Sequence, residues 1–227
     1  MQEKGCTVYR NVINCIVMIN VNTKEIKMET KKYLSCKETA KLIRKGLKTN
    51  FPGVKFSVRS DTYAGGASIR VKYTNGPLTK DVEAYVKQYE GAGFDGMTDY
   101  KYYMSHYMNT ITGEICLAKC EQTYSSHEVD EEIPEGEGWV AVSFGADYVF
   151  VRQNLTKEII EEAIEISENQ HPQIKGLIEV REGYSGANVC CHALLEKLHH
   201  SNEAQWLNNQ VYKNIRLVAQ ANYIMGA

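Results

Sequence analysis

The stretch Val58–Val71, VRSDTYAGGASIRV, alternates apolar and polar residues on both sides of a turn. The alternation continues outward, so that apolar residues recur at every second position over 54–58 and again over 67–73. A period of two is typical of a strand with one buried face. The central DTYAGG supplies glycines, which accept the positive φ angles that tight turns need. The stretch therefore predicts a β-hairpin with one apolar and one polar face.

A similar string, VREGYSGANVCC, occupies residues 180–191 and predicts a second hairpin. Each hairpin follows a predicted amphipathic helix, over 35–50 in the first half and 155–170 in the second. Ser35 followed by Glu38 is a capping-box pattern and places the start of the first helix. Both helices end at a proline-containing breaker, FPG and HPQ, and helical sequence follows both hairpins.

These matching orders predict an α+β fold built from two similar helix–hairpin–helix units, a pseudo-duplication with small antiparallel sheets packed on helices. Chance similarity of two short hairpins is the alternative. The predicted organisation has four parts: an N-terminal hairpin arm or extension (1–32), a first α+β unit (33–110), an acidic linker loop (111–137) and a second α+β unit (138–227).

Charge is distributed unevenly although the net charge is only −2. Residues 28–110 hold 14 Lys and Arg against 8 Asp and Glu, whereas residues 111–227 hold 8 against 18. A basic half and an acidic half indicate two surfaces with different roles. Alternatively, the halves attract each other, within one chain or between copies.

The cysteines indicate a reducing, cytoplasmic environment, because seven is an odd number and no secretory signal precedes them. The apolar run VINCIVMINV (12–21) is too short to span a bilayer, so we expect a strand there and no membrane contact. Met28 opens a segment that looks like a natural start, and residues 1–27 are then an added arm or an upstream extension.

The polar face of the first hairpin gives the main candidate binding site. Two-residue spacing places its cations on one side, where they can contact phosphates, while an aromatic residue at the turn can stack on bases. The alternative is an ordinary solvated face. The candidate residues are Lys55, Arg59, Tyr63, Arg70 and Lys72. The first predicted helix adds a basic stripe of Lys37, Lys41, Arg44, Lys45 and Lys48.

Two other clusters are weaker candidates. Phe94 and Asp95 could belong to a small-molecule binding loop; the favoured interpretation is a tight Asp-Gly turn with Phe94 and Met97 filling the core. Six residues are of types that bind zinc, but their spacing matches no standard motif, so we expect no metal and no cofactor. They are Cys116, Cys120, His127, Cys190, Cys191 and His192.

No catalytic signature accompanies the six histidines, and no phosphate-binding loop of the nucleotide-hydrolase type occurs.

A glutamate-rich helix, with Glu158, Glu161, Glu162, Glu165 and Glu168, could mimic a row of phosphates, pair with the basic half, or simply be solvated.

A family resemblance is carried by YLSCKETAKLIRKGLKTNFPGVKFSVRS, by VEAYVKQYEGAGFDGMTDYKYY and by FGADYVFVRQN. The chain from about Tyr33 onward resembles the twenty-ninth of the large polyvalent protein-associated domains. The resemblance implies an accessory role in phages, plasmids or conjugative elements of bacteria, including counter-defence. It implies no activity and no catalytic residues. The chain departs from the usual setting in lacking a recognisable enzyme domain beside the match and in its cysteine-bearing second hairpin.

From these observations we expect a non-enzymatic accessory protein of a mobile element or phage that binds nucleic acid or a nucleotide-like ligand through its basic first unit. The first alternative is a protein–protein interaction module, in which the acidic half engages a host factor, such as a defence protein, or copies of the chain assemble. The second alternative is an unrecognised enzyme.

Overall fold

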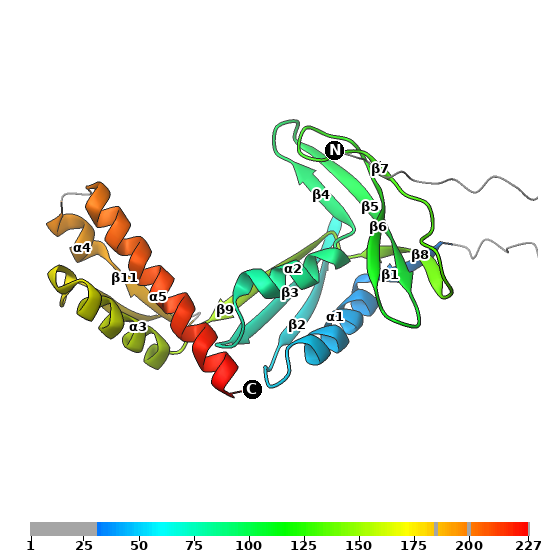
Figure 1. Ribbon diagram of the computed structural model, residues 1–227. Helices are drawn as coiled ribbons and strands as arrows, with labels where there is room; N and C mark the ends of the chain where they lie inside the picture. Colours follow the sequence, from blue (N-terminus) through cyan, green and yellow to red (C-terminus); the bar gives the residue numbers. More distant parts are fainter. Residues whose placement is uncertain (1–30, 184–185, 199–200, 227) are drawn as a thin grey trace, which may run out of the picture.

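The computed structural model describes residues 31–183, 186–198 and 201–226. The predicted N-terminal arm and the strand expected at 12–21 lie outside the described residues, apart from the last two positions of the arm. The described chain forms two lobes (Figure 1), which we call the N-terminal lobe (31–156) and the C-terminal lobe (157–226). Each lobe has its own cluster of buried hydrophobic residues.

Helix α1 (Cys36–Asn50) begins where the sequence predicted. The Glu38 amide donates to the Ser35 hydroxyl at 3.4 Å, and the Glu38 carboxylate accepts from the Ser35 amide at 2.9 Å, which completes the capping box. Its apolar stripe, including Ala40, Ile43 and Leu47, is fully buried. The predicted cap and stripe are thus confirmed.

A three-stranded sheet forms the centre of the N-terminal lobe. Its strands are β2 (Ser57–Tyr63), β3 (Gly66–Thr74) and β9 (Tyr148–Asn154). Strand β2 is antiparallel to β3, as the hairpin prediction requires, and β9 lies parallel to β3 on its other side. The inner face packs against α1 and against α2 (Thr79–Val86), which continues into a short 3₁₀ turn at Lys87–Tyr89.

The second sheet is built mainly from the strands that lie between β3 and β9 in the sequence. The strand that precedes α1 completes it. Its order is β1 (Lys32–Ser35), β8 (Trp139–Gly145), β5 (Tyr100–Asn109), β6 (Ile115–Cys120) and β7 (Val129–Asp130), and β4 (Ala92–Asp95) also pairs with β5. Only residues 146–147 separate β8 from β9, although the two strands belong to different sheets.

The C-terminal lobe is a helical layer with one small hairpin. Its elements are α3 (Lys157–Gln170), a 3₁₀ turn (Pro172–Ile174), β10 (Glu179–Gly183), β11 (Gly186–Cys190), α4 (His192–Lys197) and α5 (Asn202–Gly226). Helices α3 and α5 pack together, and a buried Asn214 amide donates to the Ser167 hydroxyl at 2.9 Å between them.

The joint between the lobes lies at the end of β9. The backbone amide of Asn75 donates to the Asn154 carbonyl at 2.7 Å, and the Asn75 side chain accepts from the Thr156 amide at 3.0 Å. Asn75 has a φ of 55°, a left-handed conformation that Asn accepts better than most residues. The turn after β3 therefore fixes the point where the chain leaves the N-terminal lobe.

The expected duplication is not seen. The order helix, hairpin, helix occurs in both halves, but the first hairpin belongs to a three-stranded sheet, whereas β10 and β11 form a two-stranded sheet by themselves among the described strands. Strands β8 and β9, which the sequence pattern groups with the second unit, pair with strands of the N-terminal lobe, and the expected linker at 111–137 contains β6 and β7.

The physical reason is that the alternation of apolar and polar residues determines which face of a strand is buried but does not determine which strand it pairs with. Two similar strings therefore specify two similar turns without specifying two similar units. The described residues form a mixed α+β structure of five α-helices and three sheets, with no evidence for duplicated helix–hairpin–helix units. None of the described helices is long and apolar enough to cross a lipid bilayer.

His106 on β5 is a buried titratable group in the core of the N-terminal lobe. Its side chain is almost fully buried, its ring packs on Phe144 with centroids 5.2 Å apart, and its Nδ1 finds no hydrogen-bond partner among the described residues. Burial disfavours the charged imidazolium and lowers the pKa of His106 to about 4.

We predict that His106 makes the protein sensitive to mild acid. The unfolded chain binds the proton near pH 6.5 and the folded chain only near pH 4, so stability falls as the pH drops through this window, by about 3 kcal/mol in total. Urea unfolding of wild type and His106→Leu between pH 7 and pH 4 measures the effect. The leucine variant should lack this part of the pH dependence; parallel curves for the two proteins would contradict the prediction.

Candidate nucleic-acid interface

The outer face of the β2–β3–β9 sheet brings together cations from three strands. The register places Arg59 opposite Arg70, and Arg70 opposite Phe150. Two residues further along, Lys72 lies opposite both Ser57 and Arg152. Paired residues in a sheet point to the same side, so these residues form two adjacent rows on one face. We call this surface the cationic face, defined by Arg59, Arg70, Lys72, Arg152, Tyr63, Tyr148 and Phe150.

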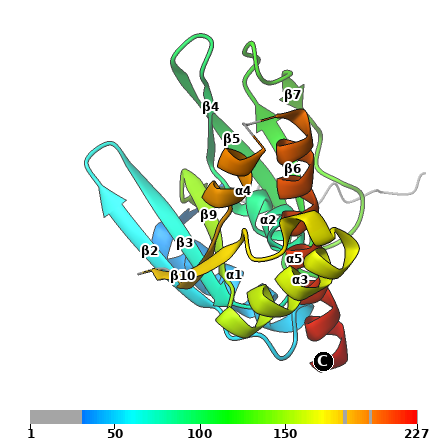
Figure 2. The same ribbon diagram turned by 90° about the vertical axis from the view of Figure 1, so that its left-hand side faces the viewer.

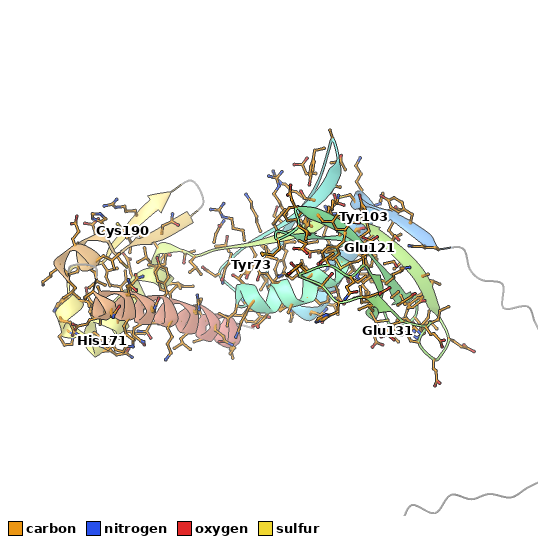
Figure 3. All side chains as sticks on the ribbon, turned by 90° about the horizontal axis from the view of Figure 1, so that it is seen from above. Tyr73, Tyr103, Glu121, Glu131, His171 and Cys190 are labelled. Carbon is orange, nitrogen blue, oxygen red and sulfur yellow. The ribbon has the colours of Figure 1, made fainter. Side chains whose placement is uncertain are left out.

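No described part of the chain covers the cationic face. Helices α1 and α2 lie on the opposite side of the sheet, as the view from above shows (Figure 3). The four cations are exposed, and Phe150 keeps 56% of its surface accessible. The C-terminal lobe therefore does not bury this surface.

Most of its positive charge is unpaired. Arg70 forms a salt bridge with Asp61 at 2.6 Å, with both side chains about half exposed. Within the part of the chain that the structure describes, Arg59, Lys72 and Arg152 form no salt bridge. An exposed ion pair of this kind contributes at most about 1 kcal/mol, so even Arg70 can exchange its partner for a phosphate.

Aromatic side chains occupy the end of the face nearest the hairpin turn. Tyr148 and Phe150 are two residues apart on β9, and their ring centroids are 6.2 Å apart with an interplanar angle of 37°. Tyr63, at the end of β2, is 52% exposed. The face thus combines accessible rings with unpaired cations.

The sequence prediction located one edge of this surface. Arg70 and Lys72 alternate with buried residues along β3, Arg59 follows the buried Val58 on β2, and Tyr63 lies at the exposed end of β2. Lys55 precedes β2 and lines a cavity of about 590 Å³ between the lobes, together with residues of α5.

Sequence reasoning missed the contribution of β9. The alternation of Tyr148, Phe150 and Arg152 with two valines is visible in the sequence, but nothing in it reveals that this strand pairs with β3. The basic stripe of α1 is exposed, but α1 covers the inner side of the sheet, so the stripe does not extend the cationic face.

The segment around Asp95 has a structural role, because it connects two loops by hydrogen bonds. Asp95 is fully buried and accepts hydrogen bonds from the Met97 amide (2.9 Å), the Tyr124 amide (2.7 Å) and the Ser125 hydroxyl (2.9 Å). Burial opposes its ionisation, but these hydrogen bonds together outweigh burial and lower its pKa. They tie the loop after β6 to the end of β4.

The expectation that Phe94 and Met97 fill the core is wrong, because their side chains are 52% and 77% exposed. They lie near the end of the β4–β5 hairpin, which projects from the lobe (Figure 2). The carboxylate of Asp95 takes the buried position there, and strand alternation turns Phe94 outward.

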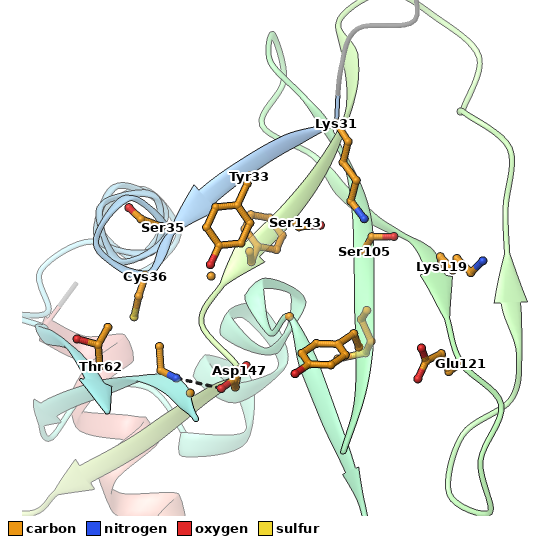
Figure 4. A pocket seen from close by; sticks show the side chains of 17 residues that line it. Lys31, Tyr33, Ser35, Cys36, Thr62, Ser105, Lys119, Glu121, Ser143 and Asp147 are labelled. Carbon is orange, nitrogen blue, oxygen red and sulfur yellow. Dashed lines mark hydrogen bonds between the residues drawn. The ribbon is translucent and has the colours of Figure 1, made fainter. Parts of the chain in front are cut away.

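A cavity of about 690 Å³ lies beside the hairpin turn, between the start of α1 and the second sheet (Figure 4). Its charged lining residues are Lys31, Lys119, Glu121 and Asp147. Asp147 already accepts from the Ala67 amide at 2.9 Å and pairs with Lys101 at 2.9 Å. Because the lining carries equal numbers of both charges, it favours no charged ligand, and the cationic face is the stronger candidate.

The possible zinc ligands are not brought together. Cys116 and Cys120 lie on β6, whereas Cys190, Cys191 and His192 lie in the other lobe. Among the described residues no three His, Cys, Asp or Glu side chains are grouped so that they could hold a metal ion. Burial raises the pKa of the Cys191 thiol to about 11, which keeps it protonated.

The chain belongs to the family described as large polyvalent protein associated domain 29, whose model matches residues 34–156. The match covers the N-terminal lobe, including all three strands of the cationic face, and ends directly before α3. No curated protein and no solved structure matches the chain significantly.

We predict that Asp95→Ala loosens the loop at 121–126 without unfolding the lobe. The amides of Met97, Tyr124 and Ser125 lose their common acceptor, so their hydrogen exchange should accelerate. Hydrogen–deuterium exchange with mass spectrometry measures this, and Glu128→Ala, an exposed acidic residue nearby, is the matched control. Unchanged exchange in the Asp95 variant would show that the carboxylate does not hold the loop.

Proposed function

We propose that this protein is a non-enzymatic accessory protein of a bacterial mobile element or phage that binds nucleic acid through the cationic face. The observation that carries the proposal is the uncovered set of four cations and accessible rings on one sheet surface. Membership of the family supports the mobile-element setting.

The arrangement suits a phosphate backbone for electrostatic reasons. Neighbouring strands lie about 4.8 Å apart, and residues two apart along a strand lie about 6.6 Å apart, so the four cations form a compact patch. A phosphate backbone presents regularly spaced negative charges, and binding releases the counterions that surround them. A patch of unpaired cations therefore gains affinity that depends strongly on salt.

The acidic side chains of the C-terminal lobe do not pair with these cations. Among the described residues each salt bridge connects two residues of the same lobe, and none joins α3 to the cationic face. The glutamates of α3 remain on its solvent side, where Glu158, Glu162 and Glu165 are exposed. The basic surface and the acidic surface are both accessible to separate partners.

The exposed glutamates favour a second candidate function, a protein–protein interaction module. Glu158, Glu162 and Glu165 recur at helical spacing along one side of α3 and could engage a basic surface of a host protein. This function is compatible with nucleic-acid binding, since it uses the other lobe.

For the first function, we expect the triple variant Arg59→Ala/Arg70→Ala/Lys72→Ala to lose most of its affinity for DNA or RNA. Because about three phosphate contacts disappear, the slope of log K against log salt should become shallower by about 2. Fluorescence anisotropy with a labelled oligonucleotide at several salt concentrations measures both quantities.

The matched control is Lys37→Ala/Lys41→Ala/Lys45→Ala, which removes the same charge from the solvent side of α1. This control should reduce affinity far less. Equal losses in the two variants would mean that net charge, and not the cationic face, determines binding.

For the second function, we expect the charge reversal Glu158→Lys/Glu162→Lys/Glu165→Lys to abolish a complex that wild type forms with a host protein. Affinity purification from host lysate with quantitative mass spectrometry compares the two. The variant should still bind nucleic acid, because the cationic face is untouched; a partner retained equally by both proteins would rule out the acidic surface of α3 as its binding site.

A further inference from the structure

The cationic face carries an apolar ring where a solvated sheet surface has no need of one. Phe150 points away from the core, on the side of β9 opposite the buried Val149, and is 56% exposed. It lies in the row of Arg59 and Arg70, next to the row of Lys72 and Arg152. An exposed phenyl ring among cations contributes little to the fold, but it offers a flat apolar surface for stacking.

We infer that the ligand of the cationic face is an unpaired, single-stranded nucleic acid. In this arrangement bases stack on Phe150 and Tyr148, while phosphates contact the four cations of the face. The inference rests on the proposed function and specifies which form of nucleic acid this site binds.

The spacing of the rings favours an extended strand. The centroids of Tyr148 and Phe150 are 6.2 Å apart, whereas successive nucleotides of a B-form strand advance by about 3.4 Å along the axis. Two neighbouring bases can each lie on one of these rings only if the strand is stretched well beyond its duplex rise. An unpaired strand allows this stretching, but a base-paired duplex does not.

Stacking also requires access to the flat surface of a base, which is hidden inside a duplex. Single-stranded binding proteins meet this requirement with aromatic side chains beside a positively charged track. Sheet surfaces that display aromatic residues are used in the same way for single-stranded RNA. The accessible ring of Phe150 satisfies the first condition, and the adjacent cations satisfy the second.

The charges on the face indicate where the backbone lies. Asp61 shares a row with Ser68 and Tyr148, and it holds Arg70 in a salt bridge. Asp61 lies on β2 and would repel a phosphate on that side of the sheet, so the favourable track runs along β9, on the other side of β3, past Arg152 and Lys72. Successive bases along this track, toward the hairpin turn, reach Phe150 first and Tyr148 next.

The test measures binding of three labelled DNA probes of about 12 nucleotides. They are an oligo-dT strand, the same length of sugar-phosphate backbone with abasic sites in place of the bases, and a blunt duplex. We expect wild type to bind oligo-dT at least tenfold more tightly than the abasic strand or the duplex at equal salt.

The variant arm replaces Phe150 by Ala, which should weaken oligo-dT binding about tenfold and leave the salt dependence unchanged, since no phosphate contact is lost. Phe150→Trp should retain binding, because it keeps a stacking surface. Phe94→Ala, which removes a similarly exposed ring from the β4–β5 hairpin, is the matched control and should have no effect.

The outcomes separate the two proposals. If wild type binds none of the probes, the proposed function itself fails. If wild type binds the duplex or the abasic strand as tightly as oligo-dT, nucleic-acid binding stands but the single-strand inference is overturned. The probe comparison uses wild type alone, so it decides the question even if a Phe150 variant folds poorly.

Discussion

The parallel pairing of β3 with β9 is the constraint on which the rest of the N-terminal lobe depends. It joins residues about eighty positions apart and aligns Ile69 with Val149 and Val71 with Val151 on the buried face. The same register necessarily aligns Arg70 with Phe150 and Lys72 with Arg152 on the other face. One set of backbone hydrogen bonds therefore builds the core and the candidate interface together.

Parallel neighbours require a crossover connection, and in this protein the crossover is a second sheet instead of a single helix. The chain leaves β3, forms α2 and the strands β4 to β8, and returns through a sharp turn at 145–147. Gly145 has no room for a side chain, because a Cβ there would collide with the carbonyl of Leu34. Asp147 then accepts from the Ala67 amide and positions the start of β9 beside β3.

Local features of this fold could be predicted from the sequence, and long-range pairings could not. The capping box at Ser35, the apolar stripe of α1 and the alternation of the first hairpin each depend on residues within a few positions of one another. For that reason half of the cationic face was predictable. Phe150 and Arg152 could not be added to it, because alternation shows only that β9 has two different faces. The inferred duplication was wrong for the same reason: the hairpin strings describe turns and say nothing about the free edge of β3.

The separation of the two hydrophobic cores explains why the cationic face stays open in a chain that also carries an acidic lobe. The buried residues of the first core lie within 34–149 and those of the second within 159–219. Because each lobe buries its own apolar surface, no hydrophobic gain draws α3 across the sheet. Attraction between exposed opposite charges is weak in water and is screened beyond about 10 Å at moderate salt. The hydrogen bonds of Asn75 with Asn154 and Thr156 fix the point where the chain leaves the N-terminal lobe at one edge of the sheet, so the glutamates can remain solvated while the arginines and lysines of the sheet remain available.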